Sequence, residues 1–285
     1  MPVPTPISTP TDDPFPPLHT APEYSIRAEF YMSVSDYEQA VTYYSQAIHL
    51  DPRSTAAYNG RGLAYRYLGQ YDLALADYND VLQLNPNDVD AYVGRGFVYS
   101  IQKKFDLALA DLNKAIQLAP NDAVAYYARG FNYARQAMDD LALADYNRAL
   151  QLDPCSAVAY YDRARIYQTQ KKYDLALADY NRALQLQPDF VYAYVGRGVV
   201  YEIQSKDDLA LADYNQALQL QPDFALAYGD RGQVYHHMGN YLLAMADYLT
   251  YQRLTGRLEG YMQAQLTDME SALTATPTLT VTPSA

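Results

Sequence analysis

The chain has 285 residues, with 33 acidic against 21 basic side chains and a formal net charge of −12. Binding to nucleic-acid phosphates needs clustered Lys and Arg, so this charge argues against a nucleic-acid partner, and it equally disfavours adsorption to anionic membranes. The single cysteine, Cys155, excludes an internal disulfide. No segment approaches the ~18 apolar residues that a membrane span needs, and no secretory signal is visible, so we expect a cytoplasmic location.

Both ends of the chain have the composition of disordered tails. Prolines interrupt the first 20 residues, with Ser and Thr between them, and Thr and Pro alternate over residues 274–285. Such segments cannot form regular helices and hold too little apolar surface to collapse. We expect the tails, 1–20 and 274–285, to be disordered, either as linkers or as segments that occupy a groove of the same chain.

Between the tails, one motif returns at a fixed step of 34 residues. The stretch from Asp72 to Asn79 recurs unchanged at 140–147, 174–181 and 208–215 and, with Leu112 in place of the tyrosine, at 106–113. Two further series keep the same step, namely Pro52, Pro86, Pro120, Pro154, Pro188 and Pro222, and Tyr24, Tyr58, Tyr92, Tyr126, Tyr160, Tyr194 and Tyr228. A period of this size is typical of stacked repeats, each too small to bury its own apolar face.

Each repeat predicts two helices. In the second repeat, Tyr58, Gly62 and Tyr65 lie at i, i+4 and i+7, which places them on one face of a first helix. Gly69 interrupts that helix. A second helix follows and ends before Pro86, because proline cannot continue a helix.

This pattern resembles the tetratricopeptide repeat, which combines spaced aromatic residues with a Leu-Gly pair, an alanine and a closing proline. The matching residues of the second repeat are Tyr58, Arg61-Gly62, Tyr65, Ala74, Tyr78 and Pro86. The resemblance implies an all-α, right-handed superhelical solenoid (an α-α superhelix) of seven helix-turn-helix repeats over residues 21–254. Their expected bounds are about 21–54, 55–88, 89–122, 123–156, 157–190, 191–224 and 225–254.

A further helix is expected after the last repeat. Over residues 257–273 a single apolar stripe runs along a helical spacing, formed by Leu258, Met262, Leu266, Met269 and Leu273. The other side of this segment is polar. We expect it to cap the exposed end of the solenoid.

The chain departs from the family pattern at one repeat position (a column, when the repeats are aligned). The leucine that precedes the glycine in the family is an arginine in every repeat, for example Arg61. Six repeats also carry an aspartate sixteen residues later, such as Asp77. Charges this close to the core are costly unless they are paired. We therefore predict a series of Arg–Asp pairs that links the two helices of a repeat or joins one repeat to the next.

No constellation of residues suggests catalysis, a cofactor or a metal site. The adjacent His236 and His237 do not share a helix face and make a poor metal pair. The aspartates are periodic, whereas a catalytic site needs unlike groups that converge. We therefore expect a protein that is not an enzyme, with no catalytic, cofactor-binding or metal-binding residues.

The side of each first helix opposite its core stripe is also apolar, which is unusual for a surface helix. In the family that the chain resembles, this side lines a concave groove for extended peptides or partner helices. The residues expected there are Asn59, Leu63, Tyr67, Val93, Phe97, Ile101, Tyr127, Phe131, Arg135, Tyr161, Arg165, Val195, Val199 and Ile203. A contiguous apolar patch of this kind indicates a partner site.

We expect a non-catalytic scaffold that binds a protein or peptide partner in this groove. Phe97 and Phe131 are flanked by Arg135 and Arg165, which suits an apolar segment that carries a carboxylate. Chaperone-binding members of the family clamp a C-terminal carboxylate with Lys, Asn and Arg. Of these clamp residues, only the Asn has a counterpart in this chain, Asn59, so we expect no such clamp.

Other interpretations of the groove stay open. Its apolar residues could simply fill the interior of a tight superhelix, or the groove could hold the chain's own tail. The alternative function is that of a structural protein that self-assembles into a homo-oligomer through its groove or its ends.

Overall fold

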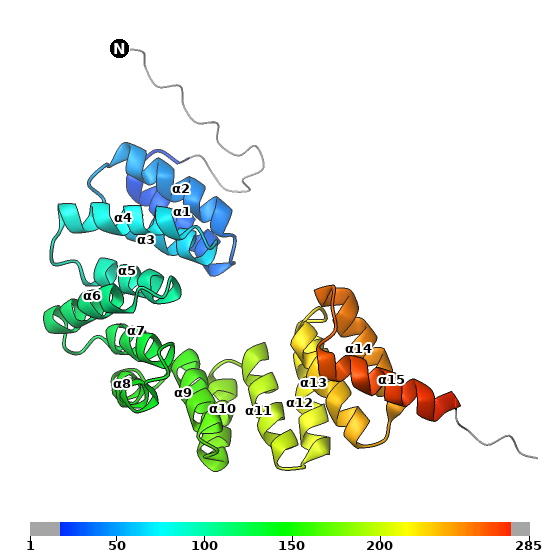
Figure 1. The fold of residues 1–285 in the computed structure, drawn as a ribbon. Coiled ribbons are helices and arrows are strands. Elements are labelled where there is room, and N and C mark those ends of the chain that lie inside the picture. The colour runs from blue at the N-terminus through cyan, green and yellow to red at the C-terminus, as the bar shows by residue number, and fades with distance from the viewer. Residues whose placement is uncertain (1–17, 275–285) are drawn as a thin grey trace, which may run out of the picture. The chain divides into compact units, whose positions relative to one another are not determined.

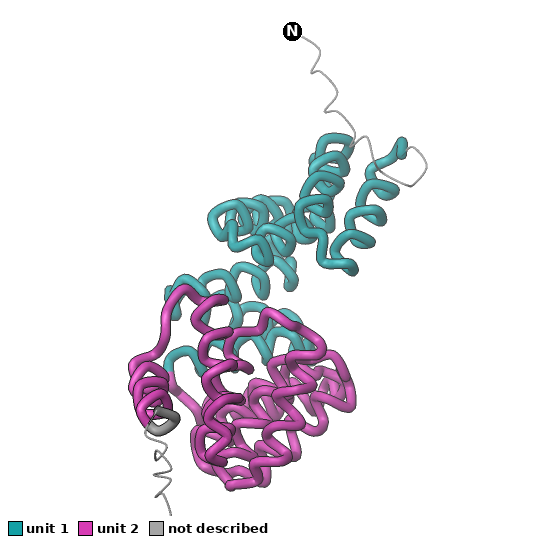
Figure 2. The backbone as a smooth tube through the Cα atoms, turned by 90° about the vertical axis from the view of Figure 1, so that its right-hand side faces the viewer, with its two compact units in different colours: residues 1–136 teal, residues 137–285 magenta. Residues whose placement is uncertain are grey.

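The computed structural model describes residues 18–274, and within that range the chain forms fifteen α-helices and no β-strand (Figure 1). The helices divide between two compact units, the first ending at Gln136 and the second beginning at Ala137 (Figure 2). The all-α helical repeat class predicted from the sequence is confirmed. None of the helices in this range is both long and apolar enough to cross a bilayer.

The helices alternate between first and second helices of the repeats, with odd and even numbers respectively, and α15 follows the last repeat. In the first unit they are α1 (Ala21–Ser33), α2 (Tyr37–Leu50), α3 (Thr55–Tyr67), α4 (Tyr71–Leu84), α5 (Val89–Ile101), α6 (Phe105–Leu118) and α7 (Ala123–Ala134). In the second unit they are α8 (Asp139–Leu152), α9 (Ala157–Thr169), α10 (Tyr173–Leu186), α11 (Val191–Ile203), α12 (Asp207–Leu220), α13 (Ala225–His237), α14 (Tyr241–Thr255) and α15 (Gly260–Thr274).

Capping side chains fix where most first helices begin. The side chain before α3, α5, α7 and α9 accepts a hydrogen bond from a backbone N–H of the first turn, and these residues are Ser54, Asp88, Asp122 and Ser156. At the same place α11 and α13 have Phe190 and Phe224, which cannot cap. Loss of such a cap costs about 1 kcal/mol, so these two rings must serve another contact.

The turn between the two helices of a repeat contains one residue in the left-handed conformation. Gly69 and Gly239 adopt it without steric cost, with φ of 72° and 75°. The other turns place a residue with a side chain there at φ between 55° and 60°, and these are Ser35, Lys103, Ala137, Lys171 and Ser205. The packing of the two helices therefore holds these turns in a conformation that costs each of them about 1 kcal/mol or more.

We predict that Ala137→Gly stabilises the protein, because glycine adopts a φ of 56° more easily than alanine. The expected gain in the free energy of unfolding is about 0.5–1 kcal/mol, measured by urea denaturation. Ala110→Gly, at an exposed position inside α6, is the matched control and should instead cost about 1 kcal/mol. Equal destabilisation by both substitutions would contradict the assigned turn strain.

First helices and second helices form separate layers within each unit. In the first unit α3 contacts α5 and α5 contacts α7, and in the second unit α11 contacts both α9 and α13. Among the described residues, the second helices make no comparable contacts with one another. Because the first helices stand closer together, each unit curves toward them, and we call the solvent-facing surface of the first helices the inner face.

The interior between the layers is built from tyrosine, alanine and glycine. Tyr78 and Tyr180 project from second helices and are 2% and 0% exposed. A Cβ atom at Gly94 would overlap the ring of Tyr78, and one at Gly196 would overlap the ring of Tyr180. The tyrosine of one repeat and the glycine of the next therefore form a single contact.

The tyrosine and proline series of the sequence meet in the turns between repeats. The hydroxyl of Tyr92 donates to the carbonyl oxygen of Pro86 at 3.2 Å, and that of Tyr228 donates to Pro222 at 3.1 Å. Each proline ends a second helix and each tyrosine lies on the next first helix. The hydrogen bond therefore ties the turn to the helix that follows it.

In five repeats one arginine joins three helices, and we call this contact the arginine bridge. Nε and Nη2 of Arg61 donate to the two carboxylate oxygens of Asp77 at 2.9 and 2.7 Å, and Nη1 donates to Ser45 at 3.1 Å. The same bidentate pair recurs as Arg95–Asp111, Arg163–Asp179, Arg197–Asp213 and Arg231–Asp247. The predicted Arg–Asp series is confirmed for these pairs, whereas Arg129 lies in the first unit and its expected partner Asp145 in the second.

The bridge also reaches the preceding repeat. Nη1 of Arg197 donates to Asn181 on α10 at 2.6 Å. The guanidinium carbon lies 5.6 Å from the ring centre of Tyr194 and 6.0 Å from that of Tyr201. Each guanidinium therefore binds its own repeat and the one before it, and this explains why both Asp and Asn recur in the repeated motif.

Burial of the aspartate in the arginine bridge disfavours its charged form, whereas pairing with the arginine favours it. Burial raises the pKa of Asp77 and Asp213, although each carboxylate accepts two hydrogen bonds from its arginine. These aspartate side chains are 4% and 7% exposed. A buried ion pair adds little net stability, but loss of one partner leaves an uncompensated charge. The bridge therefore selects the stacking register of the helices more than it adds net stability.

We predict that Asp213→Asn destabilises the protein by about 2–3 kcal/mol, because it leaves the guanidinium of Arg197 without a counter-charge in a mostly buried site. Urea denaturation measures the change. Asp208→Asn, an exposed position in the first turn of the same helix, is the matched control and should cost less than about 1 kcal/mol. The role of the bridge is contradicted if the two variants unfold alike.

The first helix of the array begins at Ala21, as expected, and residues just before it also pack on the first repeat. Leu18, which the sequence assigns to the disordered tail, packs against the core of the first repeat, and the hydroxyl of Tyr24 donates to its carbonyl oxygen at 3.4 Å. Arg27 of the first repeat lies 5.8 Å from the ring centre of Tyr43, which stands where other repeats have an aspartate. The parts of the two tails expected to be disordered at 1–17 and 275–285 lie outside the described residues.

The C-terminal end closes the core of the second unit. Helix α14 ends at Gly256, which is left-handed with φ of 76°, and α15 begins at Gly260 rather than at residue 257. Met262, Leu266 and Met269 of α15 are at most 5% exposed and belong to the same core cluster as α14. The part of the apolar stripe from Leu258 to Met269 thus faces the last repeat.

Candidate binding faces of the two units

A band of aromatic rings and a guanidinium group crosses the inner face of the first unit. The guanidinium carbon of Arg66 on α3 lies 4.7 Å from the ring centre of Tyr67 and 5.1 Å from that of Phe97 on α5. The ring centre of Phe97 in turn lies 5.8 Å from that of Tyr127 and 5.7 Å from that of Phe131, both on α7. Three successive first helices therefore present one continuous aromatic surface.

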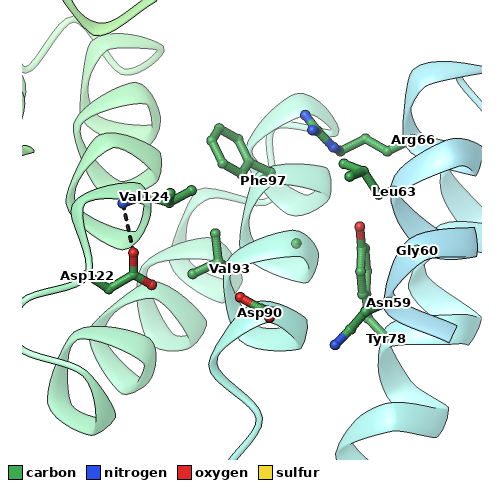
Figure 3. Close-up of a pocket in the computed structure, with 11 residues that line it drawn as sticks. Asn59, Gly60, Leu63, Arg66, Tyr78, Asp90, Val93, Phe97, Asp122 and Val124 are labelled. Carbon is green, nitrogen blue, oxygen red and sulfur yellow. Dashed lines mark hydrogen bonds between the residues drawn. The ribbon is translucent and has the colours of Figure 1, made fainter. Parts of the chain in front are cut away.

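A pocket of about 280 Å³ opens in this surface between α3, α5 and the start of α7 (Figure 3). Its apolar walls are Leu63, Val93, Phe97 and Val124. Figure 3 shows Arg66 beside Phe97 at one end of the pocket and the carboxylate of Asp90 at the other. The pocket is therefore apolar along its length and oppositely charged at its ends.

Asp90 has no hydrogen-bond or ion-pair partner within residues 18–274. Burial and the nearby carboxylates of Asp88 and Asp122 raise the pKa of Asp90. Those two neighbours are already engaged as helix caps, because Asp88 accepts from the backbone N–H of Ala91 at 3.0 Å and Asp122 from that of Val124 at 2.8 Å. Asp90 is therefore the carboxylate that remains available to a ligand.

Two other polar atoms of the pocket also lack partners. Asn59 donates through Nδ2 to Asp88 at 3.0 Å, which turns its Oδ1 away from that carboxylate. Oδ1 of Asn59 and Nε of Arg66 are buried and have no hydrogen-bond partner in the described part of the chain. Since buried polar atoms are nearly always hydrogen-bonded, the pocket has one unsatisfied buried acceptor, on Asn59, and one unsatisfied buried donor, on Arg66.

In the second unit, aromatic rings gather where the turns meet the first helices. The ring centre of Tyr161 on α9 lies 5.0 Å from that of Phe190 and 6.4 Å from that of Tyr192, which in turn lies 5.0 Å from that of Phe224. The guanidinium of Arg165 lies 5.8 Å from the ring centre of Tyr161. Phe224 is 8% exposed and Tyr192 is 52% exposed, so Tyr192 is the accessible part of this cluster.

The structure places the residues expected in the groove in several surroundings, and Val93, at 6% exposed, both lines the pocket and belongs to a core cluster. Those that line the pocket or belong to the two aromatic surfaces are Asn59, Leu63, Tyr67, Val93, Phe97, Tyr127, Phe131, Arg135, Tyr161 and Arg165. Val195 is 9% exposed and Val199 packs against the same core cluster, so both stabilise the second unit. Ile203 is 50% exposed and Ile101 is half-buried.

Sequence reasoning did not find Arg66, Asp90, Phe190 or Phe224. Three of them had a signal in the repeat pattern, because Phe190 and Phe224 replace capping residues and Asp90 stands at a position that is otherwise apolar, whereas the position of Arg66 varies in every repeat. The residues at the position of Asp90 in the other repeats are Pro22, Ala56, Val124, Val158, Tyr192 and Leu226. Such a departure is visible only when each column is compared down all repeats.

Two carboxyl groups approach each other on the inner face of the second unit. Burial and the charge of Glu202 on α11 raise the pKa of Asp230 on α13 to about 7. Glu202 accepts a hydrogen bond from the hydroxyl of Tyr214 at 3.1 Å, and burial raises its pKa as well. Within residues 18–274 no three His, Cys, Asp or Glu side chains are arranged to hold a metal ion.

We predict that Asp230 makes stability depend on pH. Its pKa is higher in the folded than in the unfolded chain, so the folded state binds more protons and the free energy of unfolding falls as pH rises from about 4 to about 7. Asp230→Asn removes this dependence, and at pH above 7 the variant should be more stable than the wild type by at least about 1 kcal/mol. Urea denaturation across this pH range measures the difference.

Asp223→Asn, which changes an exposed carboxylate of the same unit, is the control for that measurement. Its stability should follow that of the wild type at every pH. If the Asp230→Asn and wild-type curves run parallel, the carboxyl group of Asp230 is ionised normally in the folded protein and the prediction is wrong.

Two family models match the chain. The model described as "Tetratricopeptide repeat" matches residues 55–88, 89–122 and 157–190, and the one described as "TPR repeat" matches residues 30–65 and 203–239. Together the matched segments cover more than half of the 285 residues. No curated protein matches the chain.

Solved structures of three helical proteins are similar to this one. The crystal structure of the APC/C hetero-tetramer Cut9-Hcn1 superposes with a TM-score of 0.72 at 14% identity, covering 88% of this chain and 52% of that chain. A tetratricopeptide repeat protein from Parabacteroides merdae gives 0.59 at 20% identity, covering 88% and 98% of the two chains, and pilF of Pseudomonas aeruginosa gives 0.65 at 17%, covering 76% and 97%. The chain spans about half the length of the Cut9-Hcn1 chain that it matches. At these identities the likeness shows the fold.

Proposed function

We propose that the chain is a non-catalytic scaffold for protein interactions, because it belongs to the tetratricopeptide repeat family, whose fold generally serves as such a scaffold. Its binding site for a peptide or partner helix is the inner face of the first unit. The observation that carries this proposal is the continuous aromatic surface on α3, α5 and α7, with a pocket of about 280 Å³ in it. The aromatic cluster of the second unit is a separate surface of the same kind.

The distribution of residues among the repeats supports the proposal. Columns that hold the repeats together carry the same residue each time, as at Arg61 and its counterparts. The column of Phe97 varies, and in the other repeats it holds Glu29, Leu63, Phe131, Arg165, Val199 and Gln233. Stacking needs identical contacts at each step, whereas recognition of one partner needs different contacts at different steps.

The central test is the substitution Phe97→Asp, which places a charge in the middle of the aromatic surface of the first unit. We expect it to weaken binding of the partner at least about tenfold, because a buried aromatic anchor dominates the energy of an interface of this kind. Affinity capture from a lysate of the source organism, followed by mass spectrometry and titration of the retained protein, measures the loss. Circular dichroism and urea denaturation establish that the variant is folded.

A second candidate function, self-assembly, is favoured by a different surface. Each second helix from α4 to α14 exposes a leucine at the same repeat position, and these are Leu73, Leu107, Leu141, Leu175, Leu209 and Leu243, all between 48% and 51% exposed. A row of exposed apolar side chains within a unit suits contact with another copy of the chain. Light scattering at tens of micromolar distinguishes the two functions, since a monomer excludes self-assembly.

Leu107→Asp, on α6 of the same unit, is the matched control for Phe97→Asp. If the partner is lost with Phe97→Asp and kept with Leu107→Asp, the inner face is the binding site. Equal retention by both variants refutes it. A wild-type oligomer that Leu107→Asp alone dissociates would instead support self-assembly.

A further inference from the structure

The pocket of the first unit contains chemistry that an apolar ligand does not explain. Its walls, formed by Leu63, Val93, Phe97 and Val124, would accept any hydrocarbon group. The carboxylate of Asp90 would then be desolvated beside two other carboxylates, which is unfavourable without a counter-charge. An occupant that fills the pocket must therefore bring a positive charge to that end.

Asn59 adds an independent constraint on the occupant. Its amide nitrogen is held by Asp88 at 3.0 Å, so its buried and unpartnered Oδ1 requires a hydrogen-bond donor. Asp90 and Asn59 both line the pocket and both offer only acceptors there (Figure 3). A cation with several N–H donors satisfies both groups at once, whereas a hydroxyl or an amide leaves the charge of Asp90 uncompensated.

The shape of the pocket indicates how a cationic side chain would lie in it. Asp90, Val93 and Phe97 are spaced by three and four residues, so they follow one face of α5 over two turns. An aliphatic stem can lie along Val93 and Phe97 while its charged head reaches Asp90. Long basic side chains commonly bury their stems on apolar surface in this way.

At the opposite end, Arg66 has a buried Nε without a partner and its guanidinium is held against the rings of Tyr67 and Phe97. A donor fixed in this position suits a backbone carbonyl of the ligand, next to the residue whose side chain enters the pocket. It also excludes a second basic group at that end. The pocket thus distinguishes the two ends of its occupant.

We propose that this pocket binds the side chain of a lysine or arginine within the partner segment, with its stem on Val93 and Phe97 and its charged head at Asp90 and Asn59. This inference rests on the proposed function and specifies its ligand. The net charge of −12 supports it, since an acidic protein attracts basic segments. The other repeats have Pro, Ala, Val, Tyr or Leu in place of Asp90, so the acid belongs to this pocket and not to the repeat scaffold.

The test uses a random-peptide phage library at physiological salt against four full-length proteins. They are the wild type, Asp90→Asn, Phe97→Asp and Asp106→Asn, of which the last removes the same charge from an exposed site on α6. The best peptides are then synthesised with their basic residue intact or replaced by norleucine, which keeps the stem and removes the charge. Fluorescence anisotropy measures their affinities.

We expect the wild type and Asp106→Asn to select apolar peptides with one fixed Lys or Arg. Asp90→Asn should bind these peptides about tenfold more weakly, and the norleucine peptide should bind equally to Asp90→Asn and to the wild type. Selection of the same peptides by the wild type and Asp90→Asn, with equal affinity, overturns the basic pocket but leaves the inner face as a binding site. Peptides that bind the wild type and Phe97→Asp equally overturn the proposed site itself.

Discussion

The arginine bridge is the contact on which the rest of the structure depends. One guanidinium binds the aspartate sixteen residues later in its own repeat and a polar side chain sixteen residues earlier, on the second helix of the preceding repeat. It therefore fixes the two helices of a repeat and the register between repeats with a single side chain. Burial raises the pKa of Asp77 and Asp213 despite this pairing, so the bridge adds geometric selectivity at a cost in electrostatic energy.

Once the bridge sets the register, the space between the helices determines which residues fit at the remaining core positions. Tyr78 of one repeat lies against Gly94 of the next because no larger residue leaves room for its ring. The tyrosines that flank each guanidinium supply apolar contact and cation–π attraction together. The scaffold therefore needs no variation from repeat to repeat, and variation is free to appear on the inner faces.

The two units use that freedom differently. In the first unit, Asp88 and Asp122 cap the helices beside the pocket and add negative charge around Asp90. In the second unit, Phe190 and Phe224 occupy the corresponding positions and exchange a helix cap for aromatic contacts. The same position of the repeat thus adds acidic side chains beside the aromatic surface of the first unit and further aromatic rings to that of the second.

Guanidinium groups of both inner faces also lie over aromatic rings. Arg135 and Arg165 each lie over a ring of their own helix, 5.6 Å from the centre of Phe131 and 5.8 Å from that of Tyr161. Arg66 lies over Tyr67 and Phe97 in the same manner. The first unit's pocket also holds the carboxylate of Asp90, which has no ion-pair partner among the described residues.

The sequence by itself determined the helical repeat, its period and the Arg–Asp pairing, because these depend on spacing along the chain and recur in nearly every repeat. It also indicated which side of each first helix is apolar, including Phe97 and Phe131. Only the tertiary structure decided what those residues contact, since Phe97 lines the first unit's pocket and meets Tyr127 and Phe131, whereas Val199 at the same repeat position packs against the core cluster of Val195. It alone brought Asn59, Arg66 and Asp90 to one pocket. The role of a residue that differs from its counterparts in the other repeats depends on its neighbours on other helices.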